Sequence, residues 1–363
     1  MTLHLYFARK FLWTFLGIMT VFLVLLALID VVDEVEDFPE LPLWEVLEIV
    51  ALNLPHANYE ILPLIVILAS VALFIRLSRT SELVVLRAAG RSALSGLMAP
   101  VAMAATIGIV SITVLNPIVA ASSKRYADLV NSHRGGGSNV LAISSDGLWL
   151  RQGSELGQTV IHATHARSDL RVLYNTTFIA FAPDGQPQKR VTARTARLGK
   201  GEWMLRGVKV WNLLPGGNSE STASLVPQYS VPSSLTHDGI IDSFGKPEFI
   251  PLWDLPMFIT QLEEAGFSAR RYSVWYQMEL ARPLFLMALV MVAASFTMRH
   301  ARLSNTGISV LSAIMLGFSL HYIRNFAQVL GENGQIPIIL AAWAPPIASF
   351  LLAFGILLHK EDG

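Results

Sequence analysis

The charged residues best placed to contact a partner lie in one short segment between two long apolar runs. Residues 78–91 read SRTSELVVLRAAGR. Thr80 or Ser81 suits a helix N-cap, Glu82 falls in the first turn where the helix dipole favours an anion, and Gly90 suits the helix stop. The pattern predicts a short docking helix.

The same segment offers an apolar side and two unlike charges. The apolar side consists of Leu83, Val84 and Leu86. Glu82 and Arg87 are expected to be free to meet another protein. The simpler interpretation is a plain connector whose arginines anchor it at a membrane surface.

Ionisable residues within the apolar runs form a second group. Asp30 lies near the end of the first run, and His321 and Arg324 lie near the end of the fifth. Such groups are costly inside a bilayer and are usually paired or functional, although long side chains also reach the headgroup region by snorkelling. Glu279 and Arg282, three residues apart, predict a pair within one helix.

Motifs of common catalytic and nucleotide-binding sites are absent from the sequence. There is no GxxxxGK[ST] phosphate loop, and the glycines at 135–137 lack the lysine of such a loop. There is no GxSxG nucleophile elbow and no cysteine. His162 and His165 form an isolated HxxH, which we interpret as a solvated pair rather than a metal site.

The composition identifies a membrane protein. Of 363 residues, 53% are hydrophobic and only 15% are charged, which is too apolar for an ordinary soluble protein. Runs of about 20 apolar residues span a bilayer. Six such runs are expected, at residues 11–32, 61–77, 93–115, 275–298, 307–329 and 336–358. The first is too long for a signal peptide, and residues 43–54 read as an amphipathic surface helix.

The polar region between the two triplets of spans has the pattern of an all-β domain. We expect residues 1–117 to hold spans one to three, 118–271 the β domain and 272–363 spans four to six. Strands separated by turn residues are expected at 148–150, 159–161, 176–181, 189–198 and 203–211. Short, evenly spaced strands favour an antiparallel sandwich or jelly roll.

Basic residues near the ends of the spans indicate the orientation. Lysine and arginine concentrate in short cytoplasmic loops. Three basic groups fall on one side of a six-span plan: Arg9 with Lys10, the arginines within 76–91, and Arg299 with Arg302. Both termini and the segment 78–91 are therefore expected in the cytoplasm, and the β domain is expected outside.

The chain resembles the lipopolysaccharide export permeases of the LptF/LptG family over essentially its whole length. The string SELVVLRAAG at 81–90 is similar to the family's coupling helix. Further similar positions are Gly147-Leu148-Trp149, Gly266-Phe267, Arg270-Arg271-Tyr272, Arg282-Pro283-Leu284 and Gly334-Gln335-Ile336-Pro337. The DxxDE run at 30–34 is more similar to the LptG type than to the LptF type.

The resemblance implies a transport subunit with named kinds of partner. The family has six transmembrane helices with a periplasmic β-jellyroll between the third and fourth, in the bacterial inner membrane. Such a permease pairs with an LptF-like paralogue, is driven by a cytoplasmic LptB-like ATPase dimer that binds the ATP, and passes lipopolysaccharide to LptC- and LptA-like proteins. The permease itself is neither an enzyme nor a cofactor-binding protein. The implied ATPase-coupling residues are Glu82, Leu83, Leu86, Arg87 and Gly90.

The resemblance also implies a lateral gate between spans one and five of opposite subunits. Asp30, His321 and Arg324 would then face one another or the substrate. Family members carry lysines where this chain has acidic residues such as Asp30 and Glu36. We therefore expect Arg324 to bind a phosphate or to pair with Asp30 across the gate. The apolar gate residues expected near acyl chains are Phe22, Leu26, Phe318 and Tyr322.

Aromatic residues in the β region suggest an apolar interior. Because strand residues alternate between faces, one face is expected to hold acyl chains or to form an ordinary core, with contributions from Trp149, Phe178, Phe181 and Trp203. Two other functions remain open from the sequence. A membrane-anchored extracytoplasmic binding or sensing protein predicts no ATPase association, and a membrane-embedded lipid enzyme predicts turnover by the isolated chain.

Overall fold

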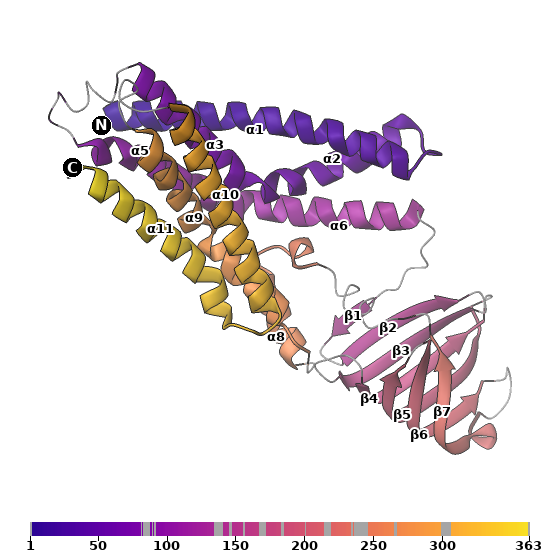
Figure 1. Ribbon diagram of the computed structural model, residues 1–363. Helices are drawn as coiled ribbons and strands as arrows, with labels where there is room; N and C mark the ends of the chain where they lie inside the picture. Colours follow the sequence, from indigo (N-terminus) through magenta and orange to yellow (C-terminus); the bar gives the residue numbers. More distant parts are fainter. Residues whose placement is uncertain are drawn as a thin grey trace. The chain divides into compact units, whose positions relative to one another are not determined.

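The protein consists of two units with separate internal contacts. The computed structural model describes residues 2–80, 82, 88, 90, 92–133, 141–144, 147–154, 157–166, 172–182, 185–199, 201–213, 219–233, 235, 246–264, 267–298 and 306–361. The helical unit comprises Met1–Tyr126, Glu248–Trp253 and Arg270–Gly363, and the β unit comprises Ala127–Pro247 and Asp254–Ala269. Figure 1 shows the elements of both units in chain order.

The described residues contain six helices that are long and apolar enough to cross a membrane, as predicted. Five of them are α1 (Thr2–Asp37), α3 (Leu62–Arg79), α9 (Arg270–Thr297), α10 (Thr306–Glu332) and α11 (Ile338–Glu361). The other is a continuous helix made of α5 (Ala93–Val110), the π-helical η1 (Ser111–Leu115) and α6 (Asn116–His133). The expected surface helix is α2 (Leu43–Glu60), which packs against α1.

The third span does not end at residue 115. The π-helical turn leads directly into α6, and the buried Ser111 Oγ donates a hydrogen bond of 2.7 Å to the Gly108 carbonyl. A serine that bonds a carbonyl of the preceding turn competes with the backbone hydrogen bonds of a regular helix, in keeping with the irregular turn here. The sequence did not indicate this extension because the residues of α6 are largely polar and its apolar run has ended.

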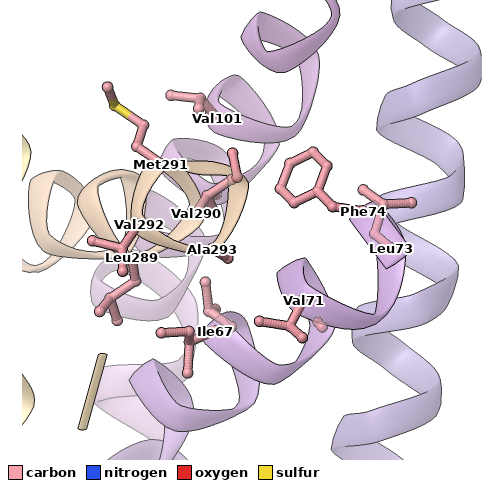
Figure 2. Close-up of a cluster of buried hydrophobic side chains, with 14 of the residues drawn as sticks. Ile67, Val71, Leu73, Phe74, Val101, Leu289, Val290, Met291, Val292 and Ala293 are labelled. Carbon is pink, nitrogen blue, oxygen red and sulfur yellow. The ribbon is translucent and has the colours of Figure 1, made fainter. Parts of the chain in front are cut away.

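Helix α9 lies at the centre of the helical unit. It contacts α3, α5, α10 and α11. Figure 2 shows part of the resulting core, in which residues 289–293 of α9 lie beside Val101 of α5 and Ile67, Val71 and Phe74 of α3. Lipid tails are as apolar as these side chains, so close packing rather than exclusion from water holds such helices together.

Two glycines permit that close packing. A Cβ atom at Gly108 of α5 would lie 2.6 Å from the Pro283 Cα atom of α9. A Cβ atom at Gly317 of α10 would overlap Ile67 Cδ1 of α3. Small residues at helix crossings let backbones approach in this way.

The β unit contains one antiparallel sheet of seven described strands. They are β1 (Leu141–Ser144), β2 (Gly147–Ser154), β3 (Gly157–Ala166), β4 (Val172–Phe181), β5 (Pro187–Leu198), β6 (Glu202–Asn212) and β7 (Ser224–Pro232). The all-β insertion is confirmed, and the five predicted strands lie within β2 to β6. The described strands pair strictly in chain order, without the Greek-key crossings of a full jelly roll.

The two outer strands were not predicted, and their sequences explain why. Strand β1 has only four residues, and β7 contains Pro227 and Pro232, which weaken a strand signal and are tolerated at a sheet edge. The remaining described elements are two short 3₁₀ turns, η2 (Ser219–Thr222) and η3 (Pro247–Phe249), and the α-helix α8 (Leu255–Glu264).

The expected aromatic interior of the sheet is present in part. Phe178 and Trp203 are buried with ring centroids 6.1 Å apart. Trp149 lies on the other face, where its ring is 4.4 Å from that of His162, and it is 40% exposed. The prediction that Trp149 shares the interior was therefore wrong. His162 and His165 are three residues apart in β3, so strand alternation directs them to opposite faces.

Candidate coupling and gate sites

Glu82, the central carboxylate of residues 78–91, is paired within its own chain. Lys10 Nζ of α1 lies 2.6 Å from Glu82 Oε1, and Thr80 Oγ1 donates to the same oxygen at 2.9 Å. Glu82 Oε2 is buried and has no hydrogen-bond partner among the described residues. The expectation that Glu82 is free was wrong, because α1 holds one of its oxygens. Thr80 is the C-cap of α3, and Ser81, the other predicted N-cap, lies outside the described residues.

The structure describes few other residues of this segment. Glu82 and Ala88 have helical backbone, and Gly90 has a φ of 73°, the left-handed conformation that commonly ends a helix. The predicted coupling residues that lie outside the described residues are Leu83, Leu86 and Arg87.

The surroundings of Glu82 keep its carboxyl group ionised. Partial burial acts to raise the pKa, but the hydrogen bonds from Lys10 and Thr80 outweigh that effect and lower the pKa of Glu82 below its ordinary value. At neutral pH the group therefore carries a negative charge.

The opposite end of α1 is also held by polar contacts. Asn53 Nδ2 of α2 donates to Asp30 Oδ2 at 3.0 Å, and Tyr126 OH of α6 donates to Glu34 Oε1 at 2.7 Å. Lys10 and Asp30 are 20 residues apart, which is about 30 Å along a helix and matches the hydrocarbon thickness of a bilayer. Helix α1 is thus attached at two levels that correspond to the two faces of a membrane.

Between these attachments the two halves of α1 differ. The phenylalanines Phe7, Phe11 and Phe15 pack into the core of the helical unit. The predicted gate residues Phe22 and Leu26 are half-buried, and Phe22 still touches that core. Beyond Phe22 the exposed large apolar side chains are Leu23, Val24, Leu25, Leu28, Ile29, Val32 and Val35. The outer half of α1 therefore presents an apolar surface to lipid or to another chain.

Helix α10 presents a comparable surface. Tyr322 is 66% exposed and Phe318 is half-buried. Other exposed large apolar side chains of this helix are Ile308, Leu311, Met315, Ile323, Phe326 and Val329. The aromatic residues predicted for a gate in α10 thus lie on or beside an exposed face, whereas the basic residues of the same helix point elsewhere.

Arg324 and His321 are buried against α9. Arg324 Nη2 lies 3.5 Å from the Met278 carbonyl oxygen, the guanidinium carbon is 5.5 Å from the Phe285 ring centroid, and Nε has no partner among the described residues. His321 Nε2 lies 3.3 Å from Asn325 Nδ2, and His321 Nδ1 has no hydrogen-bond partner within the part of the chain that the structure describes. Arg324 is only 7% exposed, so it does not snorkel out of this chain. The structure brings neither residue to Asp30 of the same chain.

Glu279 and Arg282 form the predicted pair within α9. Arg282 donates to both carboxylate oxygens, with an Nε to Oε2 distance of 3.0 Å. The sequence did not indicate that Tyr59 of α2 completes this site. Its hydroxyl donates to Glu279, its carbonyl accepts from Arg282 Nη1 at 3.1 Å, and its ring centroid is 3.9 Å from the guanidinium carbon. Burial raises the pKa of Tyr59, so the phenol remains a neutral donor.

The buried charged residues of α9 and α10 together carry an excess of positive charge. Glu279 supplies one negative charge, whereas Arg282 and Arg324 supply two positive charges. Glu279 is already bonded to Arg282, and among the described residues no carboxylate forms an ion pair with Arg324. A buried cation without a counter-ion is costly, so an anionic group from outside this chain would be stabilised at Arg324.

Two motifs that are distant in sequence meet at the end of α10. Arg270 Nε, at the start of α9, donates to the Gly331 carbonyl at 2.6 Å, and its Nη2 donates to the Ile336 carbonyl at 2.5 Å. Gly334 takes a φ of 80° in the same turn. Arg270 therefore caps the C-terminal end of α10 and fixes the turn that leads into α11.

Comparison with known proteins supplies an independent finding. The family model described as "Lipopolysaccharide export system permease LptF/LptG" matches residues 5–359. The chain is 23% identical over 317 residues to the lipopolysaccharide export system permease protein LptG of Escherichia coli (strain K12), covering 85% of this chain and 84% of that protein. It is 21% identical over 327 residues to LptG of Haemophilus influenzae (strain ATCC 51907 / DSM 11121 / KW20 / Rd), covering 88% and 87%. The family match includes all six spans and the sheet.

Proposed function

We propose, since this chain belongs to the LptF/LptG family of lipopolysaccharide export permeases, that it is the LptG-type subunit of a heterodimeric transporter. It pairs with an LptF-like chain, extracts lipopolysaccharide from the inner membrane and passes it along the β unit to LptC- and LptA-like proteins. The observation that carries this proposal is the family match over nearly the whole chain, on a fold with six spans and an inserted antiparallel sheet.

The proposed orientation places the termini in the cytoplasm and the sheet in the periplasm. Lys10 and Glu82 meet at one end of α1, and the acidic residues Asp30 and Glu34 lie at the other. The meeting of basic segments at one end agrees with the preference of lysine and arginine for the cytoplasmic side.

Energy is proposed to enter through a separate LptB-like ATPase that contacts Glu82. Support comes from the position of Glu82 in the SELV string and from its Oε2 atom, which is unpartnered among the described residues. The test is co-purification of the ATPase with the full chain in mild detergent. Glu82→Ala and Glu82→Lys should both reduce recovery, and Glu82→Lys should reduce it more because it repels a basic partner. Glu36→Ala, an exposed carboxylate at the other end of α1, is the matched control and should recover the ATPase normally.

The alternatives predict other results of the same experiment. Recovery of no ATPase by the unmodified chain would favour a membrane-anchored binding or sensing protein. Turnover of a lipid by the isolated chain would favour an enzyme. Depletion of the protein, followed by assay of lipopolysaccharide at the cell surface, tests the transport function directly, and unchanged surface lipopolysaccharide would contradict it.

Arg324 is proposed to receive its anion from outside this chain. The anion is a carboxylate of the paired permease, such as one equivalent to Asp30, or a phosphate of lipopolysaccharide. Arg324→Met keeps much of the side-chain volume without the charge and should reduce export, whereas Arg324→Lys should retain more of it because a cation remains. Exchanging the two charges, with Arg324→Asp in this chain and arginine in place of the facing carboxylate of the paired permease, should restore export only if those two positions pair. Normal export by Arg324→Ala would contradict this role.

A further inference from the structure

Glu82 has two carboxylate oxygens with different surroundings. Oε1 accepts hydrogen bonds from Lys10 Nζ and Thr80 Oγ1 at 2.6 and 2.9 Å. Oε2 is buried and has no hydrogen-bond partner among the described residues. A carboxylate can accept from several donors at once, so the contact with Lys10 at Oε1 leaves Oε2 with acceptor capacity for a basic group once that oxygen is uncovered.

Lys10 is itself fixed in place. Its Nζ atom lies 4.5 Å from the Tyr6 ring centroid, a distance suited to a cation–π contact. The side chains of Lys10 and Glu82 are only 20% and 25% exposed. Phe7 and Phe11, on either side of Lys10, are buried in the core of the helical unit. The lysine therefore extends from a well-packed turn of α1 rather than from a loose end.

Lys10 also lies on α1, which is the least buried of the six candidate spans. Beyond Phe22, α1 exposes its apolar side chains until Asp30 and Glu34 meet Asn53 and Tyr126. A displacement of the well-packed inner end is carried along the continuous helix from Thr2 to Asp37. Of the described residues at this end, Lys10 forms the ion pair that joins α1 to the segment holding Glu82.

We propose that Lys10 is a positioning residue that links ATPase docking to movement of α1. Glu82 binds Lys10 through Oε1 and a basic group of the ATPase through Oε2, so that one carboxylate connects the partner to the gate helix. This inference rests on the proposed function, because it requires an ATPase at Glu82. It assigns to Lys10 a role in transmission rather than in docking.

A spin label on α1 tests this link. The chain has no cysteine, so Leu28→Cys gives a single label on the exposed outer half of α1. Leu351→Cys gives a control label at an exposed position of α11. In the complete complex, the Leu28 label should change mobility between the nucleotide-free and vanadate-trapped states. Lys10→Met should lower the ratio of the two label states in the vanadate-trapped complex by up to about fivefold, the upper range for one partly exposed ion pair, while ATPase recovery stays within about twofold. Lys10→Arg should preserve the change.

The paired exchange Lys10→Glu with Glu82→Lys separates the two roles of Glu82. It restores an ion pair inside the chain but presents a cation to the ATPase, so it should lose ATPase recovery as Glu82→Lys does. Full recovery by the exchange would overturn the inference, as would an unchanged Leu28 response in Lys10→Met. Loss of ATPase recovery in Lys10→Met equal to that of Glu82→Lys would also overturn it. If the unmodified chain recovers no ATPase, the proposed function itself fails and this inference fails with it.

Discussion

Helices α1 and α9 are both long and apolar, yet α9 is mostly buried within this chain and α1 is mostly not. In the apolar stretch of α9, 72% of the residues are buried, and in that of α1 only 6% are buried. Helix α1 is nevertheless the more apolar of the two. In water this would be an unstable arrangement, but in a bilayer lipid or a neighbouring subunit covers an apolar helix at little cost.

The difference extends to how the two helices use charge. Helix α9 carries its ionic pair, Glu279 with Arg282, in its buried middle, where Tyr59 adds a hydrogen bond. Helix α1 has its polar contacts at its two ends, through Lys10 and Asp30. The central helix is thus buried along its length, whereas the peripheral helix packs into the core through its inner half and has its polar contacts near its two ends. That arrangement suits a scaffold in the first case and a movable gate element in the second.

The largest effect is expected from Glu279→Gln in α9. The substitution leaves Arg282 and Arg324 without a buried carboxylate, and removing one partner of a buried ion pair costs about 3–5 kcal/mol. The loss should appear as a lower melting temperature of the purified protein in detergent. Asp30→Asn in α1, a half-exposed carboxylate, is the control and should change the melting temperature far less. Equal losses would remove the contrast between the helices.

The second-largest loss of stability is expected from a glycine that packs against α9, in contrast to a glycine of α1. Gly108→Ala in α5 would place a Cβ atom 2.6 Å from the Pro283 Cα atom of α9, a backbone atom that cannot move aside alone. Such overpacking costs about 1–3 kcal/mol. A Cβ atom at Gly17 of α1 would have nothing within 4 Å, so Gly17→Ala should be neutral or stabilise by up to about 1 kcal/mol through helix propensity. Thermal unfolding of both variants measures the difference.

A smaller effect is expected at the outer attachment of α1. Asn53→Ala removes the hydrogen bond to Asp30 and should cost about 1 kcal/mol. Its clearer consequence is greater mobility of a spin label at Leu28→Cys, because one of the two polar contacts at the outer end of α1 is lost and only that between Tyr126 and Glu34 remains. Asn58→Ala is the matched control, since Asn58 bonds only the Leu54 carbonyl of its own helix among the described contacts. Unchanged label mobility in Asn53→Ala would show that the outer end is held by other contacts.

The smallest effect is the pH dependence of the inner attachment. The folded-state pKa of Glu82 lies below its ordinary value of 4.5. Its contribution to stability is therefore fully present above about pH 4.5 and is lost as the pH falls through the lower folded-state value. A spin label at Leu5→Cys, an exposed position on α1, should show constant mobility from neutral pH down to that range and a rise below it. With Glu82→Gln the label should lack this acid transition.

Local patterns in the sequence were sufficient for the plan of the molecule. The six spans follow from the lengths of apolar runs, and α3 covers the predicted 61–77 almost residue for residue. The inner strands follow from alternation and turn residues, and the pair of Glu279 with Arg282 follows from a spacing of three on one helix. Each of these features depends on neighbours in the chain, so it is visible without the fold.

The tertiary structure decided which side of each helix faces the protein. Hydropathy does not report this in a membrane, because lipid and protein interior are both apolar. For that reason the sequence did not reveal that Arg324 turns toward α9 while Tyr322 faces outward. It also did not reveal that Lys10 meets Glu82, since the two residues are 72 positions apart and only the packing of α1 beside α3 brings them together.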